Sequence, residues 1–209
     1  MISQKDELTT DTSNLLILGS GSAARRELLA SIGLLPDIIE KPEIDESLKP
    51  NESPVSYVKR MAEEKANAIL LKKQPYLITA DTIVVAGSRV LSKTSDEKVA
   101  YSYLRMLSGR RHTVFTAFCV KHNGILSSKI VKTSLKMRLL SAKEINDYIA
   151  CREWVGSAGA YRIQGRAKTF IPFISGCFSN VVGLPIPKLV SVLKGRGYYR
   201  GVNEQGNNN

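Results

Sequence analysis

The sequence is poor in the residues from which several kinds of functional site are built. Its 209 residues include two histidines, one tryptophan and three cysteines. The cysteines are odd in number, far apart and outside any metal-binding spacing, which predicts reduced thiols in a cytoplasmic protein rather than a disulfide framework. The two histidines, His112 and His122, are too isolated to indicate a catalytic role.

Long apolar runs and basic blocks are also missing. No apolar stretch approaches the roughly 20 residues that a membrane span needs, so we expect no membrane partner, and the polar first fourteen residues do not resemble a signal peptide. The net charge of +11 is scattered along the chain, without a nucleic-acid module signature. We therefore expect no nucleic-acid partner. The charge fits either simple solubility or an enzyme that attracts an anionic small molecule.

Strand and helix signals alternate between two polar tails, which we place at residues 1–13 and 199–209. Strands are expected at 15–18, at 76–85 (one strand interrupted at Asp81, or a strand pair), at 113–120 and at 129–139, with a strand-like stretch over 159–178. Helices are expected at 23–33, 53–72, 95–109, 141–150 and 185–195, with Ser53, Ser95 and Ser141 as N-caps. Because 113–139 forms an antiparallel hairpin, the pattern predicts one α/β domain over 14–198 with mixed strand directions.

The segment after the first expected strand is the clearest chemical signal. Small residues, among them Ser20 and Ser22, lead into a helix whose first turn carries Arg25 and Arg26. Small residues allow an anion to approach the backbone, and a helix N-terminus offers free N–H groups and the positive end of its dipole. The pattern predicts a phosphate site, although helix capping alone would also explain the serines.

Two nucleotide-binding patterns can be compared with this loop. The P-loop consensus is absent from the sequence. Gly19, Gly21 and Ala24 satisfy the loose dinucleotide pattern, and Glu40 and Glu43 lie about twenty residues further on, where a ribose-binding acid is expected. A dinucleotide-dependent oxidoreductase should continue with regular βαβ repeats, and this chain does not.

Charged residues in apolar surroundings form the second signal. Asp81 lies within an apolar β-type run, where a carboxylate is costly without a metal or a cation as its partner. It is either a turn-forming residue or a metal ligand or general base. The acids Asp45 and Glu46 suit Mg²⁺ or Mn²⁺ beside a phosphate. Lys65 lies among alanines on the core side of its helix, and Lys93 is a similar candidate, although each could be a solvated charge.

Eight segments, in order, resemble the successive motifs of the Maf-like nucleoside triphosphate pyrophosphatases: LILGSGSAARRELLASIGL, IDES, MAEEKANAI, ITADTIVV, LSKTSDEKVAYSYLRMLSGRRHTVFTA, LSAKEINDYIA, AGAYRIQG and FSNVVGLP. The resemblance implies a cytoplasmic, metal-dependent hydrolase that splits a nucleoside triphosphate into a monophosphate and pyrophosphate. It also implies a Maf/ITPase-like fold, with two lobes around an elongated mixed β-sheet flanked by helices and the nucleotide in a central cleft.

The resemblance also implies roles for individual residues. Asp81 falls on the catalytic aspartate, and Asp81 with Glu46 would hold the divalent metal, Mg²⁺ or Mn²⁺. The residues implied to bind the substrate are Ser20, Ser22, Arg25, Lys65 and Lys93. The residues implied to separate substrate classes are Ala24, Thr82 and Gln164.

The specificity positions give a mixed signal. Thr82 and Gln164 match the branch that acts on dTTP and UTP, whereas Ala24 stands where that branch has arginine and the 7-methyl-GTP branch has tryptophan. The sequence leaves open the preferred base, the metal used and whether the protein is a monomer or a homodimer. A second function also stays open, that of a nucleotide-sensing or partner-binding regulator of cell division and septum formation.

Overall fold

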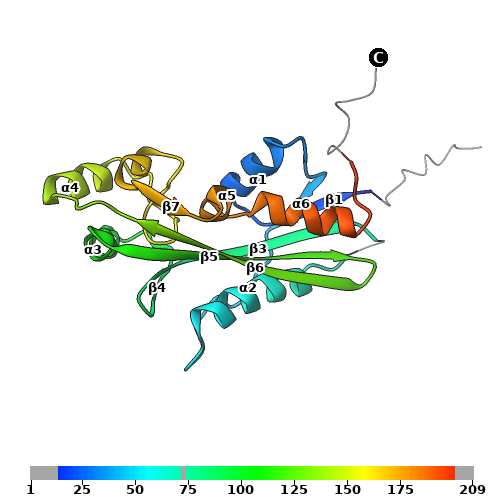
Figure 1. Cartoon of the computed structure of the whole chain (residues 1–209). Helices are drawn as coiled ribbons and strands as arrows, with labels where there is room; N and C mark the ends of the chain where they lie inside the picture. Colours follow the sequence, from blue (N-terminus) through cyan, green and yellow to red (C-terminus); the bar gives the residue numbers. More distant parts are fainter. Residues whose placement is uncertain (1–13, 72–73, 201–209) are drawn as a thin grey trace, which may run out of the picture.

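The computed structural model describes residues 14–71 and 74–200, so the expected tails lie outside the described residues except for 199 and 200. A seven-stranded mixed β-sheet forms the centre of the protein (Figure 1). Its strands are β1 (Leu16–Gly19), β2 (Ile38–Ile39), β3 (Tyr76–Ala86), β4 (Arg89–Leu91), β5 (Arg111–His122), β6 (Ile125–Lys136) and β7 (Phe173–Ser175). The mixed α/β fold with helices on both faces confirms the expected fold class.

The strands lie in the order β2-β1-β3-β5-β6-β7, and β4 pairs with β3. β1 is parallel to both β2 and β3, whereas the other pairs are antiparallel. β1 pairs with β3 only up to Gly19, which is opposite Thr79. β4 pairs with the same side of β3 further along, over residues 84–86, so this side of β3 is unpaired only over residues 80–83. The free side of β3 beyond Gly19 therefore lies next to the end of β1, where parallel strands usually present their ligand sites.

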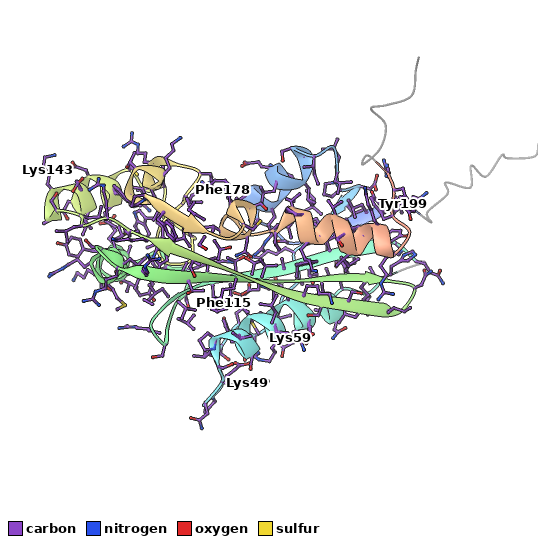
Figure 2. The ribbon with its side chains drawn as sticks, in the orientation of Figure 1. Lys49, Lys59, Phe115, Lys143, Phe178 and Tyr199 are labelled. Atoms are coloured by element: carbon purple, nitrogen blue, oxygen red, sulfur yellow. The ribbon has the colours of Figure 1, made fainter. Side chains whose placement is uncertain are left out.

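The helices are α1 (Ala23–Ala30), α2 (Pro54–Ala68), α3 (Glu97–Leu107), α4 (Ala142–Ala150), α5 (Phe178–Val182) and α6 (Ile186–Gly195), with a 3₁₀ helix at Arg166–Phe170. α2 covers one face of the sheet, α1, α5 and α6 lie on the other, and α3 and α4 lie together at one end (Figure 1). Figure 2 shows the two faces through Lys59 of α2 and Phe178 of α5, which lie on opposite sides of the sheet. Among the described residues, no helix has the length and apolar character needed to cross a membrane.

The apolar interior divides into three clusters around the sheet. One packs α2 against β3 and β5 around Met61, and a second packs α1 and α6 against the opposite face around Phe118. The third, around Trp154, fills the end of the molecule between α3, α4 and the 154–170 segment.

Local sequence signals explain most helix starts. Ser53 caps α2, and Ser141 forms the expected capping box with Glu144. The expectation for α3 is wrong by one residue, because the side chain of Asp96 rather than Ser95 accepts the hydrogen bonds from the first-turn amides. A carboxylate is an equally good cap with the added attraction of the helix dipole.

Other expectations need correction. β3 is one continuous strand through Asp81, which pairs in register with Ala117. The 159–178 stretch is mostly turns and 3₁₀ helix, with only Phe173–Ser175 in the sheet. α2 ends at Ala68, before the expected 72, and β6 begins at Ile125 rather than 129. The prediction did not include β2, β4 or α5, which are too short to carry a periodic pattern.

Candidate functional site

A cavity of about 460 Å³ opens beside the free side of β3. The β1–α1 loop lines one part of it, and the 155–164 segment with the end of α5 lines another. Val84 of β3 and Val114 of β5, which are paired in register, give it an apolar portion away from the loop. A cavity with one charged and one apolar portion suits a ligand that has an anionic part and a flat ring.

The β1–α1 loop is held close to the sheet. A Cβ at Gly19 would lie 2.6 Å from Thr79 Cγ2, so glycine allows the chain to lie this close to β3 where the loop begins. Ser22 caps α1 by accepting a hydrogen bond from the Arg25 amide, and Ser20 Oγ accepts one from the Ser22 amide at 3.3 Å. The capping interpretation is thus correct for Ser22, and both serines also line the cavity.

The Arg25 side chain is buried in the wall of the cavity, at 5% exposure. Its Nε donates to the Gly183 carbonyl at 2.8 Å, Nη1 to Ser20 Oγ at 2.9 Å and Nη2 to Thr82 Oγ1 at 3.1 Å. Burial lowers the pKa of Arg25, and the charges of nearby carboxylates oppose that shift. The guanidinium therefore joins the loop, β3 and the turn after α5, as well as lining the cavity.

Lys65 accounts for the carboxylate buried on β3. Its Nζ lies 2.7 Å from Asp81 Oδ1 and 2.7 Å from Glu46 Oε1. The ion pair gives Asp81 the cationic partner that its position requires. Lys65 and Glu46 line the cavity, whereas the buried Asp81 is not among the lining residues and adjoins them through its ion pair with Lys65.

Glu46 is the more accessible of the two carboxylates. Burial alone would raise the pKa of Glu46, but the hydrogen bond from Lys65 and the nearby positive charges outweigh it and hold this pKa below its ordinary value. Glu46 is therefore ionised at neutral pH and available as an oxygen ligand.

The donor set suits a divalent metal that arrives with its substrate. No group of three or more histidine, cysteine or acidic side chains is placed to hold a metal within the described part of the chain. Glu46 and Asp81 nevertheless lie close together, because one oxygen of each is 2.7 Å from the Lys65 ammonium, which would have to yield this position to a bound metal. Mg²⁺ commonly takes one or two carboxylates, with substrate phosphates and waters completing its shell, so these residues fit the implied metal.

The remaining predicted residues are placed around the same cavity. Ala24, Lys93 and Gln164 line it, and so does Thr82. Burial lowers the pKa of Lys93, and the positive charge of Arg25 adds to that shift. The Thr82 hydroxyl lies 3.0 Å from Thr116 Oγ1 and also accepts the hydrogen bond from Arg25. Most of the hydrogen-bonding capacity of this hydroxyl is therefore already used within the protein. The structure thus brings nine of the ten predicted residues to the cavity surface, and the tenth, Asp81, is bonded to one of them.

Lys41, Tyr161 and Arg162 are among the further lining residues that the prediction did not name. Tyr161 Oη lies 2.8 Å from Nε2 of the buried His112. Lys41 follows β2, whose two adjacent isoleucines between two prolines could have indicated a short strand, although none was predicted there. Nothing local to Arg162 distinguishes it from a solvated arginine.

Fold and site together define an α/β protein with an anion-binding cavity beside a mixed sheet. A family model described as Maf-like protein matches residues 15–196. The chain therefore belongs to the Maf-like protein family, as its motifs predicted.

Curated relatives match over almost the whole chain. A protein of Cereibacter sphaeroides named dTTP/UTP pyrophosphatase is 45% identical over 182 residues, which are 87% of this chain and 95% of that protein. One of Neorickettsia sennetsu named nucleoside triphosphate pyrophosphatase is 45% identical over 189 residues, 88% of this chain and 89% of the relative. The solved Ham1 protein of Staphylococcus aureus overlaps 58% of this chain and 71% of its own, at a TM-score of 0.36 and 13% identity, which is too distant to support an argument.

Proposed function

We propose that this protein hydrolyses nucleoside triphosphates to the monophosphate and pyrophosphate. The observation that carries the proposal is the charge of the cavity. Its lining has one acid, Glu46, and five cationic residues: Arg25, Lys41, Lys65, Lys93 and Arg162. Such a surface favours a polyanion, and the names of the relatives point to the same chemistry.

The shape of the cavity suggests how the nucleotide lies. The amides of the β1–α1 loop, with Ser20 and Ser22, receive the phosphates. The base lies toward Val84 and Val114, where Gln164 can read its edge. Because the Thr82 hydroxyl is already bonded within the wall, Gln164 has the greater share of base recognition, and dTTP and UTP are the substrates to test first.

The chemistry is an attack of water on the α-phosphorus. Glu46 and Asp81 would hold Mg²⁺ or Mn²⁺, which supplies charge neutralisation on the phosphates when it is bound. Asp81 orients or deprotonates the water. Lys65 and Lys93 stabilise the negative charge that grows on the leaving pyrophosphate. The cytoplasmic location expected from the sequence stays a prediction.

The test is product analysis with a panel of nucleoside triphosphates and with Mg²⁺, Mn²⁺ or no metal. We expect a nucleoside monophosphate and pyrophosphate in equal amounts, only with metal, and fastest with dTTP or UTP. Formation of a diphosphate and orthophosphate would contradict the proposal. Nucleotide binding without turnover would favour the sensing function instead.

A further inference from the structure

We propose that Lys41 is an additional substrate-binding residue, whose ammonium group contacts the outer phosphates that leave as pyrophosphate. The inference deepens the proposed function and rests on it. Three observations support it: the place of Lys41 at the end of β2, the position of its side chain beside the phosphate loop, and the lack of an acidic partner.

The backbone places Lys41 at the ligand-binding edge of the sheet. Ile39 pairs with Leu18 in the parallel β1–β2 ladder, and the Glu40 amide donates to the Leu18 carbonyl at 3.0 Å. Lys41 therefore leaves the sheet beside Gly19, at the carboxyl ends of two parallel strands. It lines the cavity together with the loop.

The side chain of Lys41 lies along the phosphate loop. A Cβ at Gly21 would be 3.5 Å from Lys41 Cδ and 3.6 Å from Cγ. The aliphatic stem thus lies beside Gly21, with room for about one methyl group between them, and the side chain lines the cavity next to the loop. A lysine often uses its stem in this way while its charge stays available.

The charge of Lys41 is not neutralised by a neighbour. Within residues 14–71 and 74–200, no acidic side chain lies within salt-bridge distance of its ammonium group, whereas the Lys65 ammonium is shared by Glu46 and Asp81. Lys41 is therefore a cation that a phosphate can engage without first breaking an ion pair.

The order of strands indicates which phosphates Lys41 reaches. β2 lies on the far side of β1 and β3 from β5, so three strand spacings, about 14 Å, separate it from the apolar portion at Val114. A nucleotide whose base lies near Val114 therefore directs the end of its phosphate chain toward Lys41. The residue belongs to the pyrophosphate end of the site and has no contact with the base.

Calorimetry with Mg²⁺ and two probes, inorganic pyrophosphate and UMP, tests this inference on the full chain. In Lys41→Met the dissociation constant for pyrophosphate should rise about tenfold, the scale of one charge-assisted hydrogen bond, while that for UMP changes less than about twofold. Arg26→Met is the matched control, since Arg26 is exposed on α1 and outside the cavity lining. It removes the same charge nearby and should leave both constants unchanged, and Lys41→Arg should retain most of the pyrophosphate affinity.

Two results would overturn the inference. Equal effects of Lys41→Met and Arg26→Met would mean that only the overall charge matters. Equal weakening of pyrophosphate and UMP would mean that Lys41 shapes the loop without contacting the outer phosphates. Because binding needs no turnover, an inactive wild-type protein would count against the proposed function while the Lys41 comparison still gives an answer.

Discussion

At the residue scale, the Asp81 carboxylate and the Lys65 ammonium account for each other's burial. Both residues are at most 6% exposed, and their charged atoms lie 2.7 Å apart. A buried charge that loses its partner is strongly destabilising. The pair is therefore both a structural link between α2 and β3 and the proposed centre of the chemistry.

Replacement of Asp81 separates these two roles. In Asp81→Asn the amide oxygen can still accept a hydrogen bond from Lys65, so we expect a folded protein with a lowered melting temperature. Turnover should fall by roughly 100-fold or more, because the group proposed to orient or deprotonate the attacking water is lost. Asp147→Asn, an equivalent change in an exposed ion pair on α4, should alter neither property. A near-wild-type rate in Asp81→Asn would disprove the assignment.

His112 makes the stability depend on pH. Burial lowers the pKa of His112 to about 4, below the value of about 6.5 in an unfolded chain. The unfolded state therefore binds more protons than the folded state between these pH values. The contribution of His112 to the free energy of unfolding is fully present above about pH 6.5, and about 3 kcal/mol is lost as the pH decreases toward 4. Urea unfolding at about pH 7 and about pH 5 measures this loss.

His112→Gln is the comparison for the pH prediction. The glutamine does not titrate, so the stability of the variant should depend less on pH across the same interval, by about 2 kcal/mol between pH 7 and pH 5. The same pH dependence in both proteins would show that other groups cause it.

At the element scale, the sequence predicts an element well where its ends carry local signals. Ser53-Pro54 and the Ser141 capping box mark helix starts, and the 122–124 turn marks the hairpin. β2 has only two residues and exists because β1 offers it a parallel edge. The 159–178 stretch has apolar residues typical of a strand, but positive φ angles at Gly159 and Ala160 turn the chain. These differences depend on tertiary contacts, which local patterns do not contain.

In the candidate site, too, local sequence signals were predictable and tertiary contacts were not. Asp81 and Lys65 were predictable because each is a charge in apolar sequence surroundings. Their pairing depends on α2 packing against β3, which brings residues 16 positions apart to 2.7 Å. The position of Lys41 in the site could be predicted only if β2 was known. The burial of Arg25 could be predicted only if its hydrogen bond to the distant Gly183 carbonyl was known. The sequence thus predicts which residues carry chemistry better than how they contact one another.

The packing of the 155–164 segment, which lines the cavity, against β3 can be tested at Gly159. A Cβ there would lie 2.9 Å from Val84, and the φ angle is +67°. Gly159→Ala should therefore lower the free energy of unfolding by more than the roughly 1–2 kcal/mol that a left-handed conformation alone costs. Gly87→Ala, at φ +62° with open space around it, should show only that smaller cost in urea unfolding. Equal losses would mean that the wall does not pack closely against β3.

At the scale of the whole molecule, the net charge of +11 and the cationic cavity act together. Long-range attraction of a nucleotide is screened by salt, because the Debye length shortens as ionic strength rises. We expect kcat/KM for UTP to fall roughly tenfold between about 0.05 M and about 0.5 M salt, with kcat little changed. A kcat/KM independent of salt would show that the charge serves solubility alone.

The central claim is that the cavity positions water for attack on the α-phosphorus of a nucleoside triphosphate. Hydrolysis of UTP in water enriched in oxygen-18, followed by mass spectrometry of both products, tests it most directly. The account predicts one heavy oxygen in UMP and none in pyrophosphate. A heavy oxygen in the pyrophosphate would place the attack at the β-phosphorus and contradict the account.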